Sequence, residues 1–204
     1  MNTSTVQTQN GVLKRILWLY GLYTLLSNAT YLLGCYLLPE GFMRGSPQVS
    51  VGRLAATGTF WSEFALTLLF NLGLVDVVSV ILNLNQVKGF PMGYIMLIPL
   101  GIMSGLIPGT NSFAASNLKQ INAWDGMALG ISIGGLEMLA YILVIASTVG
   151  LGVYQYRSWW QWKSTKVMNF RDVRLSRAEL VCLIVGILLL FFAAYRETVM
   201  AMNL

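Results

Sequence analysis

The chain has 204 residues, of which 56% are hydrophobic and only 10% are charged, and its formal net charge is +5. Soluble domains carry about 25% charged residues, so this composition indicates an integral membrane protein rather than a nucleic-acid-binding one. The chain contains no histidine, which excludes histidine-ligated metals and haem as well as Ser-His-Asp and Cys-His catalysis. We therefore expect no enzyme, no metal site and no cofactor.

The N-terminal part reads as a short polar tail, residues 1–11, followed by a single transmembrane domain, residues 12–204. Lys14 and Arg15 precede the first apolar run, residues 16–38. This run is too long for the hydrophobic region of a signal peptide, so we expect it to be retained as a membrane anchor. The second predicted span, residues 59–83, is the most polar one and carries polar side chains on two faces. A helix of this kind should be flanked on both sides, so we expect it to be central.

Glycines recur at every fourth position in the third and fourth predicted spans, residues 90–107 and 126–153. Such glycine faces let two helix backbones approach closely in lipid, and we expect these two spans to pack against each other. Pro99 is expected to kink the third span near its middle, and a broken helix lining a binding cavity is the alternative. The predicted packing residues are Gly101, Gly105, Gly126, Gly130 and Gly134.

The longest polar connection, residues 154–178, combines tryptophans with basic residues and precedes the fifth predicted span, residues 180–198. Tryptophans at the headgroup level followed by basic residues are typical of a segment on the cytoplasmic membrane surface. Ser176 and Glu179 have the spacing of a capping box at the start of the fifth span. The residues predicted to dock on the membrane surface or a partner are Arg157, Trp159, Trp160, Trp162, Lys163 and Lys166.

The basic residues are distributed unequally between the two sides of a five-span bundle. With the N-terminus inside, nine lysines and arginines fall on the cytoplasmic side and four on the other. The positive-inside rule then predicts an all-α, five-helix membrane bundle with a cytoplasmic N-terminus and an external C-terminus. We expect a multi-pass protein of a prokaryotic cell membrane.

Several charged and polar side chains lie inside the predicted spans, where each is costly unless it has a partner or a function. Glu137 lies on the glycine face of the fourth span, and we expect it to be neutral and to donate a hydrogen bond to Asn71 or Asp76. On one interpretation Glu137 only stabilises helix packing, and on the other it is a functional carboxyl group. Arg196 is expected near the outer leaflet, within reach of Glu63. The functional candidates are Glu137, Asp76, Asn71, Glu63, Arg196 and Glu197.

Residues from about 60 to 204 resemble the stage II sporulation protein M family of multi-span membrane proteins. The family has a His-Gly-x-x-Glu-Leu-x-Ala-like motif at its penultimate span, a Gly-Leu-x-x-Gly end to that span, an Ala-x-Ile-Glu-Ala end to the last span, and a Phe-x-Asn-Asn-x pattern in an earlier span. The chain departs from the family at Ile133, where histidine is frequent, and at Arg196. The matching residues here are Gly134, Leu136, Glu137, Met138, Ala140, Gly150, Leu151, Gly152, Ala193, Ala194, Glu197, Phe70, Asn71 and Leu72.

The resemblance implies a protein without known catalysis that acts through partners, with other membrane-protein subunits as the expected ones. A non-catalytic scaffold or an accessory subunit of a larger membrane complex is the function that we predict, and a homo-oligomer stays open as well. The alternative is a small permease or permease subunit with buried carboxylates on its pathway, because intramembrane charges often mark such pathways.

Overall fold

The computed structural model describes residues 9–56, 58–113, 123–160 and 163–202. The chain is mostly helical, and five of its described segments are long and apolar enough to cross a membrane. The number of spans and their helical class are therefore as predicted, whereas the orientation in the membrane stays a prediction. The five segments are Gly11–Leu37, Phe60–Asn83, Met92–Gly109, Gly134–Leu151 and Arg177–Met202.

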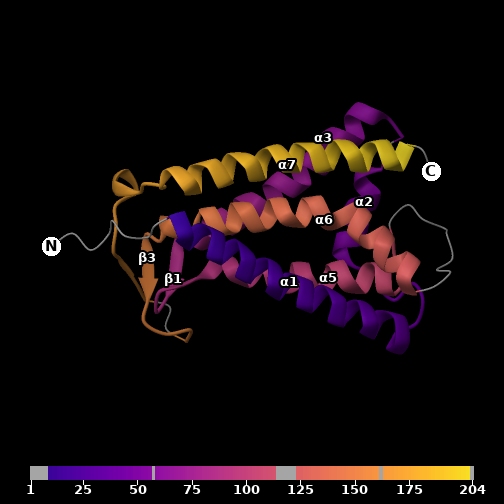
Figure 1. Ribbon diagram of the computed structural model, residues 1–204, viewed down its shortest axis with the longest axis horizontal. Coiled ribbons are helices and arrows are strands. Elements are labelled where there is room, and N and C mark those ends of the chain that lie inside the picture. The colour runs from indigo at the N-terminus through magenta and orange to yellow at the C-terminus, as the bar shows by residue number, and fades with distance from the viewer. Residues whose placement is uncertain (1–8, 57, 114–122, 161–162, 203–204) are drawn as a thin grey trace.

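The helices that build these segments lie roughly along the long axis of the molecule (Figure 1). Helix α1 begins at the end that carries a small sheet, and α7 ends at the opposite end, as an odd number of spans requires. The long helices are α1 (Gln9–Leu37), α3 (Phe60–Phe70), α5 (Leu97–Gly109), α6 (Ala123–Ser147) and α7 (Arg177–Met202). The shorter ones are α2 (Pro47–Ala55), the π-helical η1 (Asn71–Val77), α4 (Val78–Asn83), and the 3-10 turns η2 (Met92–Met96), η3 (Val149–Leu151) and η4 (Phe170–Asp172).

The most buried helix is α6, not the second span. From Met138 to Thr148 nearly every side chain of α6 is buried, with Tyr141, Ile142 and Ile145 at the centre of two apolar clusters. The second span exposes large apolar side chains such as Leu69, at 63%, along one side. The prediction that the second span is central is therefore wrong. The buried polar residues of the second span lie on its protein-facing side, so neighbouring helices on that one side are enough to bury them.

Glycines on α5 mark a tight helix contact, but the partner is α1. A Cβ atom at Gly105 would overlap Thr30 Oγ1 and the Ser27 carbonyl oxygen, and one at Gly101 would lie 3.0 Å from Leu26 Cβ. The Thr30 hydroxyl keeps a hydrogen-bond partner in this close contact, because Thr30 Oγ1 donates to the Leu26 carbonyl oxygen of its own helix at 2.8 Å. The predicted pairing of the third and fourth spans through these glycines is thus wrong.

On the side of α6, a Cβ atom at Gly134 would meet no heavy atom within 4 Å. The surroundings of Gly126 and Gly130 lie outside the part of the chain that the structure describes. Helix α6 packs instead most extensively along α7, where a Cβ atom at Gly186 would lie 3.1 Å from the Ala140 carbonyl oxygen. The close helix pairs are therefore α1 with α5 and α6 with α7.

The third span begins later than predicted. Phe90 and Pro91 form a strand, and η2 then leads into α5. Pro99 is consequently the third residue of α5 and lies in its first turn, where the backbone N–H groups have no partner within the helix. The predicted kink in the middle of the helix is therefore absent at Pro99, and the span changes from 3-10 to α geometry at Leu97 instead.

The polar connections at one end form a four-stranded sheet, so the fold is not purely helical. The strands are β1 (Asn85–Val87), β2 (Phe90–Pro91), β3 (Tyr154–Tyr156) and β4 (Ser164–Lys166), in the order β2-β1-β3-β4. Strands β1 and β2 are joined by Lys88 and Gly89, both with positive φ, which is the geometry of a tight hairpin turn. Strands β1 and β3 are parallel, with Asn85 opposite Tyr154. The sheet therefore joins two connections that are distant in sequence.

The capping box at the start of α7 is confirmed. The Ser176 N–H donates to Glu179 Oε2 at 2.9 Å, and the Glu179 N–H donates to Ser176 Oγ at 3.3 Å. Glu179 also accepts from Arg15 of α1 at 2.8 Å, so the same carboxylate fixes the start of the last helix and its contact with the first.

Candidate functional site

Asp76 occupies a π-helical stretch in the middle of the second span. Single π-helical turns inside α-helices frequently occur at functional sites because they break the regular hydrogen-bond ladder. Asp76 is 4% exposed, and neither of its carboxyl oxygens has a hydrogen-bond partner among the described residues. Ser79, one turn later, is fully buried and its hydroxyl is likewise unpartnered within the described part of the chain. These two side chains form an unsatisfied polar spot inside an apolar bundle.

Glu137 of α6 lies near this spot and has a direct partner on its own helix. The Tyr141 hydroxyl, one turn along, donates to Glu137 Oε1 at 2.6 Å. Asn71 lies beside the Glu137 carboxyl, although its Nδ2 makes no hydrogen bond of normal geometry among the described residues. The well-formed hydrogen bond of Glu137 is thus the one from Tyr141, which was not expected, while Asn71 lies beside the carboxyl group as expected. The neutral state of Glu137 stays a prediction.

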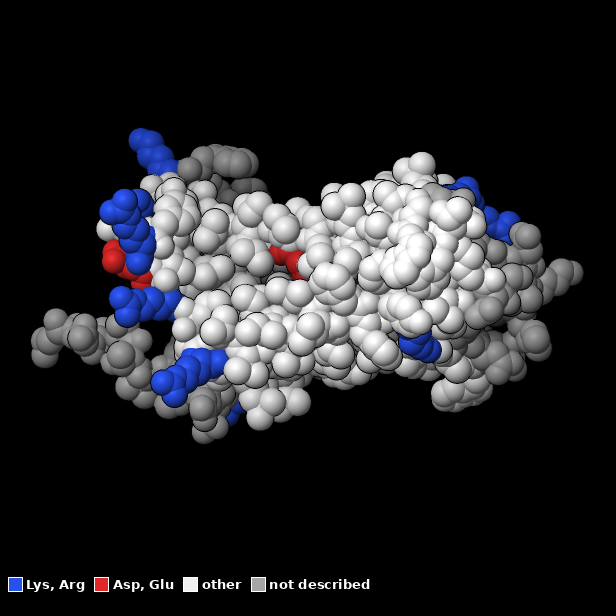
Figure 2. Space-filling model, turned by 90° about the horizontal axis from the view of Figure 1, so that it is seen from above, with Lys and Arg blue, Asp and Glu red and all other residues white. Residues whose placement is uncertain are grey.

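Three carboxyl groups from three different spans share this region. Asp76 and Glu197 of α7 each interact electrostatically with Glu137. Tyr141, which is 2% exposed, interacts with all three. We call Asp76, Glu137, Glu197, Ser79 and Tyr141 the carboxyl cluster. In Figure 2, acidic atoms are visible in a hollow about midway along the molecule, where the surrounding surface is uncharged, while the basic side chains lie toward its two ends.

No cation compensates the carboxyl cluster among the residues that the structure describes. Arg196, the nearest candidate by sequence, donates instead to the carbonyl oxygen and the hydroxyl of Ser132 on α6, the latter at 2.7 Å. Glu63 lies apart, at the start of α3, and accepts from the Gly58 N–H at 2.7 Å. The expected proximity of Arg196 and Glu63 therefore produces no ion pair. Carboxyl groups in a bundle without a compensating cation can bind and release protons.

The predicted docking residues gather on and around the loop between β3 and β4. Trp159 and Trp160 are 54% and 90% exposed, and Arg157, Lys163 and Lys166 are exposed as well. Trp162 lies outside the described residues. The Trp159 ring packs against Phe90 of β2 at a centroid distance of 5.8 Å. Figure 2 shows basic side chains gathered at this same end of the molecule, which agrees with a membrane-surface position for the sheet.

Sequence reasoning named the three carboxyl groups but missed Tyr141. Its spacing of four residues from Glu137 places both on one helix face and was the available signal. The described residues contain no group of three or more side chains suited to hold a metal ion.

No family model, curated protein or solved structure matches this chain.

Proposed function

We propose that this protein is a small permease of the cell membrane, or the membrane-embedded subunit of one, in which the carboxyl cluster exchanges protons during transport. The observation that carries the proposal is the Asp76 carboxyl group, buried at 4% exposure with no partner for either oxygen among the described residues.

A purely structural role does not account for this carboxyl group. A buried unsatisfied polar group costs about 1–3 kcal/mol, and evolution commonly removes such a cost by pairing the group or replacing it. A group that must accept and release a proton needs instead to be free of permanent partners. Protons can move to and from Asp76 through the hydroxyl groups of Ser79 and Tyr141. The π-helical turn that contains Asp76 supplies further polar groups, since its backbone hydrogen bonds are irregular.

Carbodiimide labelling tests the proton-binding step directly, because a hydrophobic carbodiimide reacts with protonated carboxyl groups within the bilayer. We expect mass spectrometry to find adducts on Asp76 that increase as the pH falls and disappear in Asp76→Asn. Asp172 is the matched control, since its exposed carboxylate accepts from Asn169 at 3.3 Å in the polar connection and should stay unmodified. Absence of any adduct on Asp76 between pH 5 and 8 would contradict proton exchange at this residue.

Proteoliposomes loaded with a pH-sensitive dye test transport. With an imposed inside-negative potential, candidate solutes should trigger proton entry in the wild type and at least about tenfold less in Asp76→Asn. Asp172→Asn should behave like the wild type. Equal proton entry in vesicles containing the wild type and Asp76→Asn would refute the proposal.

The second candidate function is a non-catalytic scaffold or accessory subunit, which the resemblance to stage II sporulation protein M relatives implies. The exposed Trp159 and Trp160 with their basic neighbours favour it, because exposed aromatic and basic side chains are common at interfaces with proteins and anionic lipid. Extraction in mild detergent should then recover a second membrane protein, or a homo-oligomer, that is lost when Trp159 and Trp160 are replaced by alanine. Recovery of the protein as a monomer without partners would argue against this function.

A further inference from the structure

We infer that a pocket between α1, α5 and α6 binds the polar end of an uncharged, hydroxyl-bearing lipid-like molecule that enters sideways from the bilayer. Binding of this molecule stands on the pocket alone; its role as the transported substrate rests on the proposed function.

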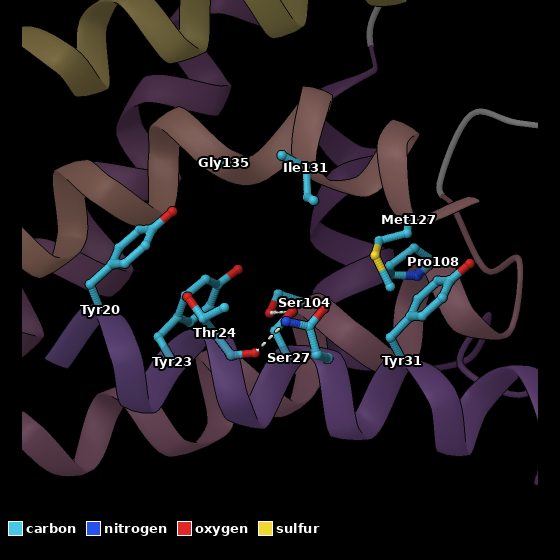
Figure 3. A pocket seen from close by; sticks show the side chains of 11 residues that line it. Tyr20, Tyr23, Thr24, Ser27, Tyr31, Ser104, Pro108, Met127, Ile131 and Gly135 are labelled. Carbon is cyan, nitrogen blue, oxygen red and sulfur yellow. Dashed lines mark hydrogen bonds between the residues drawn. The ribbon is translucent and has the colours of Figure 1, made fainter. Parts of the chain in front are cut away.

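The pocket is a cavity of about 120 Å³ between the middle of α1 and the halves of α5 and α6 remote from the sheet. Figure 3 shows tyrosines on α1 pointing toward α6, with Ile131 of α6 above them and Met127 at the side. Gly135 completes the wall of α6 and leaves the space open, since a Cβ atom there would make only one ordinary contact, 3.6 Å from Ile131 Cγ2.

We expect the mouth of the pocket to open toward lipid. Its lining residues on α1 and α5 lie within the segments that are apolar enough to cross a membrane, whereas Met127 and Ile131 precede the corresponding segment of α6. Two of the lining residues are well exposed, Tyr20 at 46% and Ile131 at 65%. A molecule that reaches the pocket by this route must first dissolve in the bilayer.

The described lining of the pocket carries neutral hydrogen-bonding groups and no charged side chain. Ser27 Oγ and Ser104 Oγ lie 3.1 Å apart, and the Tyr23 hydroxyl interacts with both. Asn28 adds a side-chain amide, which donates to the Thr24 carbonyl oxygen at 2.9 Å. Such groups can bind a hydroxyl group, which both donates and accepts a hydrogen bond, or a carbonyl group, which only accepts one. An ammonium or carboxylate head would enter without a counter-charge, which is costly at this depth.

The size of the cavity limits what enters. A cavity of about 150 Å³ accommodates a benzene ring, so this one admits a polar head and its first few carbon atoms. The rest of the molecule stays in the bilayer. Tyr23 connects the pocket with the carboxyl cluster, because it also interacts electrostatically with Glu137 and packs in the apolar cluster around Tyr141. A bound hydroxyl group would thus lie one side chain away from the proposed proton-exchange site.

Photolabelling of the full chain in phosphatidylcholine nanodiscs tests binding. The probe is a sixteen-carbon primary alcohol with a diazirine near the hydroxyl; the matched probes are the amine and the carboxylic acid of the same length. We expect saturable labelling of peptides containing residues 20–31, 104–108 or 127–135, at least about tenfold stronger with the alcohol than with either charged probe. Equal labelling by the three probes, or labelling spread along lipid-facing α7, would overturn the inference.

Two neighbouring glycines supply a matched pair of variants. Gly135→Leu should fill the pocket and reduce labelling by the alcohol about tenfold, whereas Gly134→Leu, which extends into open space outside the pocket, should leave it unchanged. Equal elution volumes and melting temperatures show that both variants are folded. Undiminished labelling of folded Gly135→Leu would overturn the inference.

Asp76→Asn separates this inference from the proposed function. This variant should lose proton entry and keep wild-type labelling. Loss of labelling in Gly135→Leu together with proton entry that does not depend on Asp76 would refute the permease and leave a lipid-binding pocket.

Discussion

Asn83 joins three spans at the end of the bundle that carries the sheet, and its removal should destabilise the protein more than that of any exposed asparagine. The side chain is fully buried at the end of α4. Its Nδ2 donates to the Ile145 carbonyl oxygen at 2.9 Å and to Thr148 Oγ1 at 2.8 Å, both from the end of α6. Its Oδ1 accepts from the Gly93 N–H at 3.1 Å, at the start of the third span.

The magnitude follows from these three bonds. Hydrogen bonds between helices in membrane proteins contribute about 0.6 kcal/mol each on average, so the two bonds from the Asn83 Nδ2 give about 1 kcal/mol. Asn83→Ala also leaves the buried Gly93 N–H without its acceptor, and an unsatisfied buried donor costs about 1–3 kcal/mol. We therefore expect Asn83→Ala to lower the free energy of unfolding by about 2–4 kcal/mol.

Reversible unfolding in mixed micelles, titrated with SDS and followed by circular dichroism, measures this loss. Asn85→Ala is the matched control, because Asn85, the first residue of β1, makes one exposed bond, to the Ile81 carbonyl oxygen of α4 at 3.1 Å. It should change stability by less than about 0.5 kcal/mol. A loss below about 1 kcal/mol for Asn83→Ala, or an equal loss for both variants, would refute the view that this side chain joins the three spans.

Three further predictions concern packing, charge and orientation. Gly105→Leu should separate α5 from α1 and lower the free energy of unfolding by at least about 2 kcal/mol, whereas Gly21→Leu, on an open face of α1, should have little effect; equal effects would contradict the tight contact. Arg15→Ala should cost about 1.5–3 kcal/mol in the same unfolding assay because it removes a charged hydrogen bond, and the exposed Lys14→Ala serves as control; unchanged stability of Arg15→Ala would show that the ion pair contributes nothing. Ser164→Cys, on exposed β4, should react with an impermeant maleimide in lysed cells and not in intact ones; reaction in intact cells would reverse the predicted topology.

The features predicted correctly are those determined by nearby residues. The length of each apolar run gives the number of spans, the Ser176–Glu179 spacing gives a helix start, and Lys88–Gly89 gives a turn. The partner of a helix is a different matter. Glycines at every fourth position show that α5 has a face suited to close contact, but both α1 and α6 are possible partners. The choice depends on Ser27 and Thr30, whose small side chains match that face.

The sheet and the carboxyl cluster illustrate the same distinction. Strand β1 pairs with β3, whose residues come after two intervening spans of the chain, and the short strands have no alternation long enough to reveal the pairing. Asp76, Glu137 and Glu197 were recognisable because charge is rare within apolar spans. Asp76 lies inside the π-helical turn Asn71–Val77, where the regular α-helical periodicity that assigns a residue to a helix face does not hold. Nothing in the residues of that turn signals the change of geometry.

The ion pair between Arg15 and Glu179 has a consequence for synthesis in the membrane. Arg15 leaves the ribosome 164 residues before its partner, so α1 can insert and pack on α5 while its guanidinium group is still unpaired. The pair forms when α7 arrives, and it joins the first and last spans at the same end of the bundle. A chain that stalls before Glu179 therefore leaves Arg15 without its counter-charge.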